Sequence, residues 1–316
     1  MPDLAPSKAA GTGGGTLLTV GMIGLFWGLN WPAMKFLLST VPPLTIRGVA
    51  LTSAALLLAL VAKALGHRLV PPLRDLPWMA VTGLLTVFGF NILVIFGQTL
   101  TETSKAAIIA YTMPAMTAVL SAVLLDERLS GRRLAALGLG MGGIAVLALE
   151  NVAALVAAPL GPLIMLGSAL CWALGTVALK AGAFTLQPMP LTVWFLGMSA
   201  VACWPLVLAF EAAWWRDPVL SRPVLAVWAW HAVLPMVVCY ALWTSLVTRV
   251  PASLAAIATL LAPFVGVSSA ILLLGDPLTW QKALALLLVL GSIALGFLPL
   301  PRFAAKAGAG PGAGSG

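Results

Sequence analysis

Ten long apolar stretches, divided by segments that contain Pro, Gly and charged residues, limit the possible folds of this chain more than any other feature. An α-helix needs about twenty apolar residues to span a membrane, and these stretches lack the alternation of a β-barrel strand. Because 61% of the residues are hydrophobic and only 8% are charged, the chain lacks the polar surface of a soluble protein. We therefore predict an all-α integral membrane protein with ten transmembrane helices. The predicted helices cover residues 16–38, 44–65, 76–98, 103–125, 131–149, 160–180, 189–210, 226–248, 252–274 and 280–298.

The basic residues stand singly at the ends of the apolar stretches, which is the pattern that orients membrane proteins. If both termini are cytoplasmic, most of the 17 Lys and Arg residues fall on the cytoplasmic side, and a smaller group that includes Arg47 falls on the other side. We therefore predict cytoplasmic N- and C-termini and a lipid bilayer as the surroundings. The formal charge of +8 does not indicate nucleic-acid binding, because the charges form no patch.

The two halves of the chain repeat each other. Five residues of the first half match five residues 149 positions later in the second: Ser104, Pro114, Glu127, Leu129 and Ser130 match Ser253, Pro263, Asp276, Leu278 and Thr279. Trp27 and Lys35 match Trp172 and Lys180 with a shift of 145, so one small insertion separates the two alignments. Because each half has an odd number of helices, the second half enters the membrane from the opposite side.

Inverted repeats hold a substrate site near the midplane and permit alternating access, although a purely structural role for the duplication stays open. The predicted organisation is an N-terminal tail over 1–15, a first five-helix repeat over 16–149, a linker over 150–159, a second five-helix repeat over 160–298 and a C-terminal tail over 299–316.

Segments in both halves resemble the EamA family of the drug/metabolite transporter superfamily. They are Leu25–Lys35, Ser104–Pro114 and Leu124–Leu147 in the first half, and Cys171–Lys180, Ser253–Phe264 and Gly275–Leu295 in the second. The resemblance covers nearly the whole chain outside the tails. It implies ten helices in two inverted five-helix repeats around a central cavity. Asp276 with Pro277 departs from the Glu that many relatives carry at this turn.

Members of that family transport amino acids, other metabolites or drugs, and within it the chain is similar to bacterial amino-acid exporters of the YddG kind. The resemblance therefore implies a small-molecule substrate, an amino acid, and a place in the bacterial inner membrane. It leaves open whether the protein works as a monomer or a homodimer.

Polar and aromatic residues inside the apolar stretches are the candidate binding residues, because such groups must face protein or water. Trp27, Asn30 and Trp31 share one face of the first helix, and Pro32 removes a backbone hydrogen bond there. This kinked polar turn suits a binding site, but Asn30 could equally tie two helices together. Pro32 is also a candidate hinge.

Further candidates lie in the third, fourth, sixth and eighth helices. Asn91 and Gln98 share a face, and Tyr111 and Tyr240 are the two tyrosines of the chain. A tyrosine in mid-membrane needs an internal partner for its hydroxyl group. The remaining candidates are Trp172, Thr176 and Trp243, whose aromatic faces would bind an apolar side chain or an ammonium group. Core packing is the alternative for each tryptophan.

Pro114 and Pro263 occupy matched positions in the fourth and ninth helices. Unwinding at these prolines would let each half rock, so we interpret both as hinges. A static kink is the alternative. The glycines of the fifth helix, which include Gly140 and Gly143, allow close helix packing, either within the chain or at a dimer contact.

The carboxylates indicate how transport is driven. All nine Asp and Glu residues fall at helix ends, in loops or in a tail, whereas proton-driven transporters hold such groups inside the membrane. We therefore predict a uniporter or exchanger. His231 is the one titratable group that could couple transport to protons; a packing role is the alternative.

No arrangement typical of an enzyme is present. Hydrolysis needs a nucleophile with a base, or a metal site, and the chain's 2 His and 3 Cys residues do not form such a set. We expect no catalytic residue, no metal and no cofactor. An uncharged cavity with aromatic and amide groups would suit neutral or aromatic amino acids. A multidrug or other metabolite exporter, with or without proton coupling, is the alternative.

Overall fold

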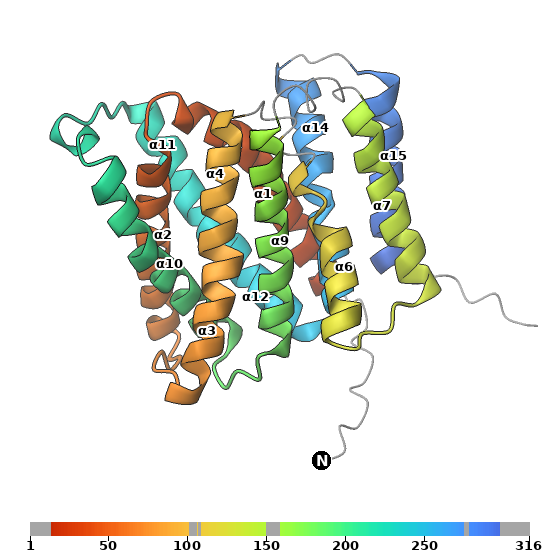
Figure 1. The fold of residues 1–316 in the computed structure, drawn as a ribbon, viewed down its shortest axis with the longest axis horizontal. Helices are drawn as coiled ribbons and strands as arrows, with labels where there is room; N and C mark the ends of the chain where they lie inside the picture. The colour runs from red at the N-terminus through yellow and green to blue at the C-terminus, as the bar shows by residue number, and fades with distance from the viewer. Residues whose placement is uncertain (1–13, 101–105, 107–108, 150–158, 275–277, 298–316) are drawn as a thin grey trace, which may run out of the picture.

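The computed structural model describes residues 14–100, 106, 109–149, 159–274 and 278–297. Over these ranges the secondary structure is helical, and no strand is assigned. Nine helical stretches among the described residues are long and apolar enough to cross a membrane, and α6 is a shorter apolar helix. The helices form one bundle (Figure 1). The prediction of an all-α membrane protein is therefore confirmed.

The helices follow the predicted spans closely. In the first half they are α1 (Gly14–Leu38), α2 (Pro43–Ala64), η1 (Leu73–Asp75), α3 (Leu76–Gly83), η2 (Leu84–Gly89), α4 (Phe90–Leu100), α6 (Met113–Leu124) and α7 (Gly131–Leu149). In the second half they are α9 (Leu160–Ala181), α10 (Pro188–Phe210), η3 (Trp214–Arg216), α11 (Arg222–His231), η4 (Ala232–Val238), α12 (Cys239–Arg249), α13 (Ala252–Thr259), α14 (Leu261–Leu274) and α15 (Trp280–Phe297). The matched residues Ser104 and Asp276, most of the N-terminal tail, the whole C-terminal tail and most of the linker lie outside the described residues.

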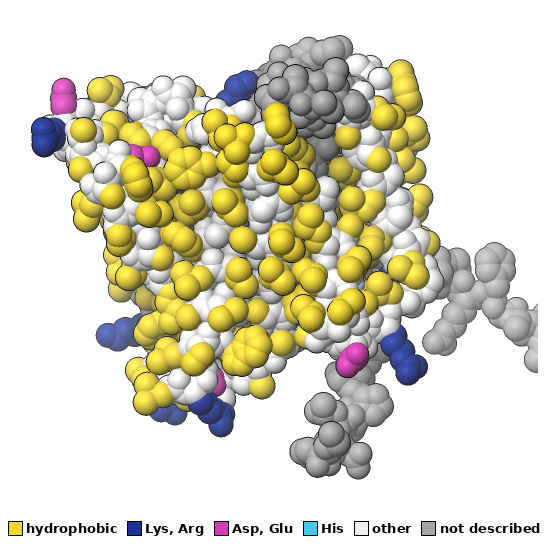
Figure 2. Space-filling model, in the orientation of Figure 1, with side chains coloured by type: hydrophobic (Ala, Val, Ile, Leu, Met, Phe, Trp, Pro, Cys, Tyr) yellow, Lys and Arg dark blue, Asp and Glu magenta, His cyan; other side chains and the backbone are white. Residues whose placement is uncertain are grey.

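The outer surface is apolar over the height of the bundle. Figure 2 shows one face on which hydrophobic side chains form a broad band, while Lys, Arg, Asp and Glu lie mostly at its upper and lower rims. Leu56, Leu60, Val119, Val201 and Leu272 are among the large apolar residues that are exposed on the surface. A surface of this kind is stable in lipid and unstable in water.

The packing of the helices repeats between the halves. α2 packs against its counterpart α10, and α7 packs against its counterpart α15. Contacts between α1 and α14 are matched by contacts between α9 and α6. On α7, Gly143 permits close approach, since an added Cβ would lie 3.0 Å from the Ala285 carbonyl oxygen of α15. Gly143 therefore serves packing inside the chain, whereas a Cβ atom on Gly138 of the same helix would meet no atom within 4 Å.

Four of the spans are interrupted, and the interruptions come in matched pairs. η2 and η4 are π-helical segments in the third and eighth spans, and residues 84–89 shifted by 149 fall on 233–238. The fourth span has a turn at Tyr111 and Thr112, and the ninth has one at Leu260. Interrupted helices in transporters line the substrate site, so the breaks locate the region where a site is expected.

The two candidate hinge prolines lie directly after the turns in the fourth and ninth spans. Pro114 is the second residue of α6, and Pro263 is the third residue of α14. In the first turn of a helix the missing N–H group of proline has no partner to lose. α1, by contrast, continues as a helix through Pro32. The hinge roles of all three prolines stay predictions.

Candidate functional site

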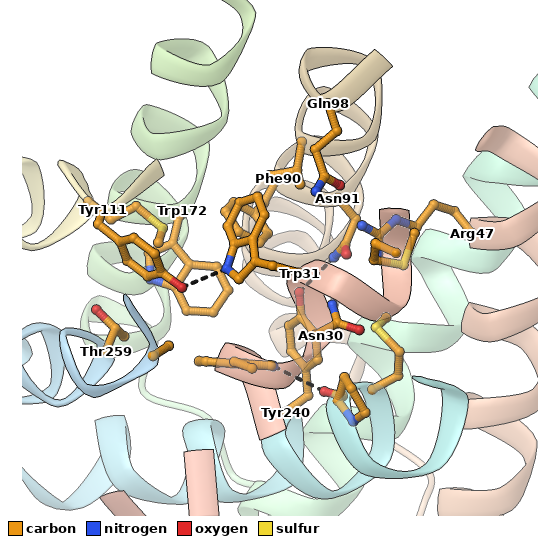
Figure 3. Close-up of a pocket in the computed structure, with 17 residues that line it drawn as sticks. Asn30, Trp31, Arg47, Phe90, Asn91, Gln98, Tyr111, Trp172, Tyr240 and Thr259 are labelled. Atoms are coloured by element: carbon orange, nitrogen blue, oxygen red, sulfur yellow. Dashed lines mark hydrogen bonds between the residues drawn. The ribbon is translucent and has the colours of Figure 1, made fainter. Parts of the chain in front are cut away.

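A central cavity lies where the interrupted spans meet α1, α2 and α9. It has about 620 Å³ of empty space, counted out to its open mouth. Figure 3 shows its lining residues as sticks. The lining residues are Trp27, Asn30, Trp31, Met34, Arg47, Phe90, Asn91, Val94, Gln98, Tyr111, Met113, Trp172, Pro235, Met236, Tyr240, Thr259 and Ala262.

Packed aromatic rings form one wall of this cavity. The ring centroids of Trp27 and Trp172 lie 5.2 Å apart in an edge-to-face arrangement, and those of Phe90 and Trp172 lie 4.7 Å apart. Trp243 packs behind them, 5.0 Å from Trp172. Aromatic pairs with these separations contribute about 0.5–1.5 kcal/mol each beyond their buried area. The wall is therefore rigid and offers ring faces and edges to an apolar ligand.

Two pairs of matched residues touch each other beside the cavity. Trp27 contacts its counterpart Trp172. Asn91 Nδ2 donates a 2.6 Å hydrogen bond to the hydroxyl oxygen of Tyr240, the residue 149 positions later. Equivalent residues can meet only near the axis that relates two repeats. The pseudo-twofold axis of the molecule therefore passes through the cavity region.

Hydrogen bonds fix the orientation of two tryptophans at the cavity. Trp31 Nε1 donates to the Tyr111 hydroxyl oxygen at 2.7 Å, which joins α1 to the turn in the fourth span. Trp27 Nε1 donates to the carbonyl oxygen of Pro235 at 3.1 Å. That carbonyl belongs to the π-helical segment η4, where the regular helical ladder is disturbed. The break in the eighth span thus provides the acceptor that holds Trp27.

Arg47 lies at the cavity with only 2% of its surface exposed. Its Nη1 atom is 3.4 Å from His231 Nε2, and His231 Nδ1 is 2.7 Å from Asn30 Oδ1. Because arginine can only donate, His231 Nε2 must carry the lone pair, and Nδ1–H then donates to Asn30. This series of hydrogen bonds from Arg47 through His231 to Asn30 requires a neutral His231. A second proton on the imidazole would remove the acceptor at Nε2 and place two cations together.

Sequence analysis placed Arg47 among the charges outside the cytoplasmic side, near the start of the span over 44–65, and did not predict that its side chain is buried at the cavity. α2 begins at Pro43, so Arg47 falls in the second helical turn, inside the bundle. Proline favours the first turn of a helix, and Pro42-Pro43 was therefore a sequence signal for this placement. His231, which the sequence left between packing and coupling, lies within hydrogen-bonding distance of Arg47.

Gln98 presents two unused polar atoms. Its Oε1 and Nε2 atoms are both buried and have no hydrogen-bond partner in the described part of the chain. Buried amides without partners are rare and need an explanation, such as a ligand or water that occupies the site. In Figure 3 the Gln98 amide is turned toward the cavity beside Asn91.

The structure brings eight of the ten candidate binding residues to this cavity: Trp27, Asn30, Trp31, Asn91, Gln98, Tyr111, Trp172 and Tyr240. Two lie elsewhere. Trp243 is fully buried behind the wall, and Thr176 donates to the Trp172 carbonyl oxygen in its own helix. Sequence reasoning missed the apolar lining from Met34, Phe90, Val94, Met113, Pro235, Met236 and Ala262, because apolar residues in a membrane span carry no distinguishing signal.

One end of the bundle is closed by polar contacts between spans. Glu127 accepts hydrogen bonds from the N–H group of Ala252 and the hydroxyl group of Ser253, at the beginning of α13. Lys180 Nζ donates to the carbonyl oxygens of Val247 and Val250, at 3.1 and 3.0 Å, at the end of α12. A carboxylate at a helix N-terminus and an ammonium at a C-terminus both match the helix dipole. The cavity residues Met34, Arg47 and Gln98 lie toward the other end, where α1 and α4 end and α2 begins.

The chain belongs to the EamA-like transporter family, whose model matches residues 15–149 and 159–298. It is 28% identical over 286 residues to the uncharacterized transporter YvbV of Bacillus subtilis, covering 89% of this chain and 90% of that protein. It is 27% identical over 276 residues to a probable amino-acid metabolite efflux pump of Escherichia coli, covering 85% and 90%. A solved crystal structure shares the fold, with a TM-score of 0.72 at 22% identity. The alignment covers 89% of this chain and 96% of the chain in that structure.

These comparisons confirm the family inferred from the sequence motifs. They show a membrane transporter that contains two copies of the family's unit, with the ten-helix architecture in two inverted repeats around a cavity. The described helices fit this architecture, with nine stretches long enough to span and α6 as the shorter one.

Proposed function

We propose that this protein exports neutral and aromatic amino acids by alternating access, as a uniporter or exchanger. The observation that carries this proposal is the composition of the cavity, in which an aromatic wall faces amide groups and one cation. The wall suits an apolar or aromatic side chain, and the polar groups suit the charged ends of a zwitterion. The described lining residues include no carboxylate, so a small zwitterion fits better than a lipophilic cation.

The similarity to the Escherichia coli protein, named as a probable amino-acid metabolite efflux pump, supports the same substrate class. The interrupted third, fourth, eighth and ninth spans support alternating access, because matched breaks allow the two halves to exchange conformations. We propose that Pro114 and Pro263 serve as hinges in this exchange, with Pro32 as a third flexible point.

The groups around His231 support transport without proton coupling. A proton carrier must gain and lose a proton during the cycle, but Arg47 stands 3.4 Å from His231 Nε2 and opposes a second positive charge. Three of the described carboxylates cap or contact helix ends and turns: Asp75, Glu127 and Glu211. These placements support transport driven by the substrate gradient.

We place the protein in the bacterial inner membrane with cytoplasmic termini, as a monomer or homodimer. The charge distribution of the loops supports this orientation. The closed end, at Glu127 and Lys180, then faces the cytoplasm, and the cavity extends toward the outside. This conformation corresponds to the state that releases an exported substrate.

The test is transport by the purified protein in liposomes, with a panel of neutral and aromatic amino acids beside lipophilic cations. We expect saturable uptake of phenylalanine, tryptophan and leucine, stimulation by the same amino acids inside the liposomes, and no accompanying pH change. Flux of the cations without amino-acid flux would contradict the substrate class and favour a multidrug exporter. Acidification or alkalinisation of the lumen in step with the flux would contradict uncoupled transport.

A further inference from the structure

The buried guanidinium of Arg47 stands apart from the other polar groups of the cavity, because it is a charge. Its side chain is 2% exposed, and it forms no salt bridge with the residues that the structure describes. Removing a cation from water is costly unless an anion or several acceptors replace the water. The neutral acceptor His231 supplies only one long hydrogen bond.

The geometry of Arg47 leaves one edge of the guanidinium unused. Nη1 is directed at His231 Nε2, and Nε is buried without a hydrogen-bond partner. In a planar guanidinium, Nε–H and one N–H of Nη2 point the same way and form a fork. Such a fork matches the two oxygens of a carboxylate.

Gln98 is the second group that lacks a partner beside this fork. α4 packs on α2, and Figure 3 shows the ends of Arg47 and Gln98 turned toward the same part of the cavity. The Gln98 Nε2 atom is a donor that remains unused. A carboxylate between Arg47 and Gln98 would therefore accept hydrogen bonds from both groups. In the described structure, Arg47 Nε and Gln98 Nε2 have no acceptor.

We propose that Arg47 and Gln98 bind the carboxylate of the transported amino acid, and that they select carboxylate-bearing substrates over the corresponding amides and amines. This inference rests on the proposed function and specifies how the substrate is oriented. The carboxylate lies toward α2 and α4, and the side chain lies against Phe90 and Trp172. His231 and Asn30 act as positioning residues, because their hydrogen bonds direct the Arg47 fork at the cavity.

A monocarboxylate fits these residues better than a phosphate does. Phosphate sites gather several donors, commonly backbone N–H groups at a helix N-terminus together with basic side chains. Here the unpartnered groups of the cavity are one guanidinium edge and one amide, and the rest of the lining is largely aromatic and apolar. The second charged end of an amino acid, its ammonium group, can use Asn91 Oδ1, since both hydrogen bonds of the Asn91 amide are made through Nδ2.

The experiment compares phenylalanine with phenylalanine amide and phenethylamine as competitors of radiolabelled phenylalanine uptake into proteoliposomes. The wild-type protein should prefer phenylalanine over both analogues, because only phenylalanine carries a carboxylate. The variants are R47Q, R47K and Q98L, with K35Q as the control, since Lys35 is an exposed cation near the same end of α1. Thermal unfolding in detergent shows which variants are folded.

Loss of charge-assisted hydrogen bonds should weaken phenylalanine binding in R47Q about ten- to hundredfold and abolish the preference over the amide. R47K should keep part of the preference, Q98L should reduce it less than R47Q does, and K35Q should leave it unchanged. If R47Q does not fold, Q98L and R47K carry the test. Retention of the full preference in folded R47Q, or in both R47K and Q98L, would overturn the inference.

The two proposals fail in different ways. If the wild-type protein transports no amino acid, the proposed function falls and the carboxylate site falls with it. If it transports phenylalanine and phenylalanine amide equally well, amino-acid transport stands and only the role of Arg47 and Gln98 is refuted. An equal loss of phenylalanine and amide transport in folded R47Q would show that Arg47 supports the structure and does not select the substrate.

Discussion

The two halves of this transporter share a scaffold but differ at matched positions in two distinct ways. A shift of 145 aligns Pro43 with Pro188, the first residues of α2 and α10. With this shift, Arg47 matches Thr192 and Asn30 matches Gly175. These differences lie in the sequence and persist in every conformation. Lys35 and Lys180 are the same residue type, yet Lys35 is exposed while Lys180 binds two carbonyl oxygens. This second difference belongs to the conformation.

The distinction has a functional meaning. When an inverted repeat changes the side to which it opens, the halves exchange conformations, so conformational differences between counterparts should reverse. Sequence differences cannot reverse. The polar end of the cavity, with Arg47, Asn30 and Gln98, therefore stays with the first half, while the closing contacts should pass from one end to the other.

The largest expected effect on stability comes from the variant G175N, which places the counterpart of Asn30 in the second half. A Cβ atom on Gly175 would lie 2.1 Å from Thr86 Oγ1 and 2.6 Å from the Thr86 backbone nitrogen. Overpacking of this kind costs about 1–3 kcal/mol or more, so we expect low yield and a lowered unfolding temperature. G197N, at a glycine with open space around it, is the control, and normal stability of G175N would show that α9 can move away from η2.

A smaller effect is expected when the closed end loses Lys180. The variant K180Q gives up charge-assisted bonds to Val247 and Val250, which should raise the population open at that end about tenfold. The measurement is the labelling rate of a cysteine placed at the cavity residue Thr259, in a background without native cysteines, by an impermeant maleimide added from that side. The counterpart variant K35Q should not raise this rate. Equal rates in K180Q and wild type would contradict a closing role.

The smallest effect is expected on the pseudo-twofold axis, in the variant Y240F. It removes the hydroxyl group that accepts from Asn91 and should cost about 0.5–1.5 kcal/mol of stability, because Asn91 keeps its bond to the Val87 carbonyl oxygen. Chemical denaturation measures the change, and the double variant N91L/Y240F tests whether the two losses are coupled. Strictly additive effects would show that the observed hydrogen bond contributes nothing to folding.

Much of the fold was predictable because apolar length and the positions of Pro, Gly and charge determine spans in a membrane. The helix predicted over 131–149 begins at the same residue as α7, and all of its residues are helical. The π-helical segments were not predicted: Pro235 marks η4, but the apolar residues Leu84 and Leu85 in η2 give no comparable signal. Such breaks depend on tertiary contacts, as between Thr86 and Gly175.

The candidate site was predictable where polar and aromatic residues stood out against an apolar background, as Asn91 and Trp27 did. It was not predictable where the partner was distant. The proposed role of Arg47 depends on His231, a residue 184 positions away, and a rule that counts charges near span ends treats such a residue only as a marker of topology. Sequence analysis named Thr176 as a binding candidate, but Thr176 is not among the lining residues of the cavity. Helical spacing tells which face of a helix a residue lies on but not which neighbour that face contacts.

The hydrogen bond between Asn91 and Tyr240 has a consequence for how a protein of this shape could arise. If five-helix chains of identical sequence paired in opposite orientations, every position on the axis would face its own copy, and an asparagine could meet only an asparagine. A donor of one type and an acceptor of another at that point require two separately inherited copies of the unit. Two copies of the unit that differ in sequence therefore free the axis from self-pairing and allow the two walls of the cavity to specialise.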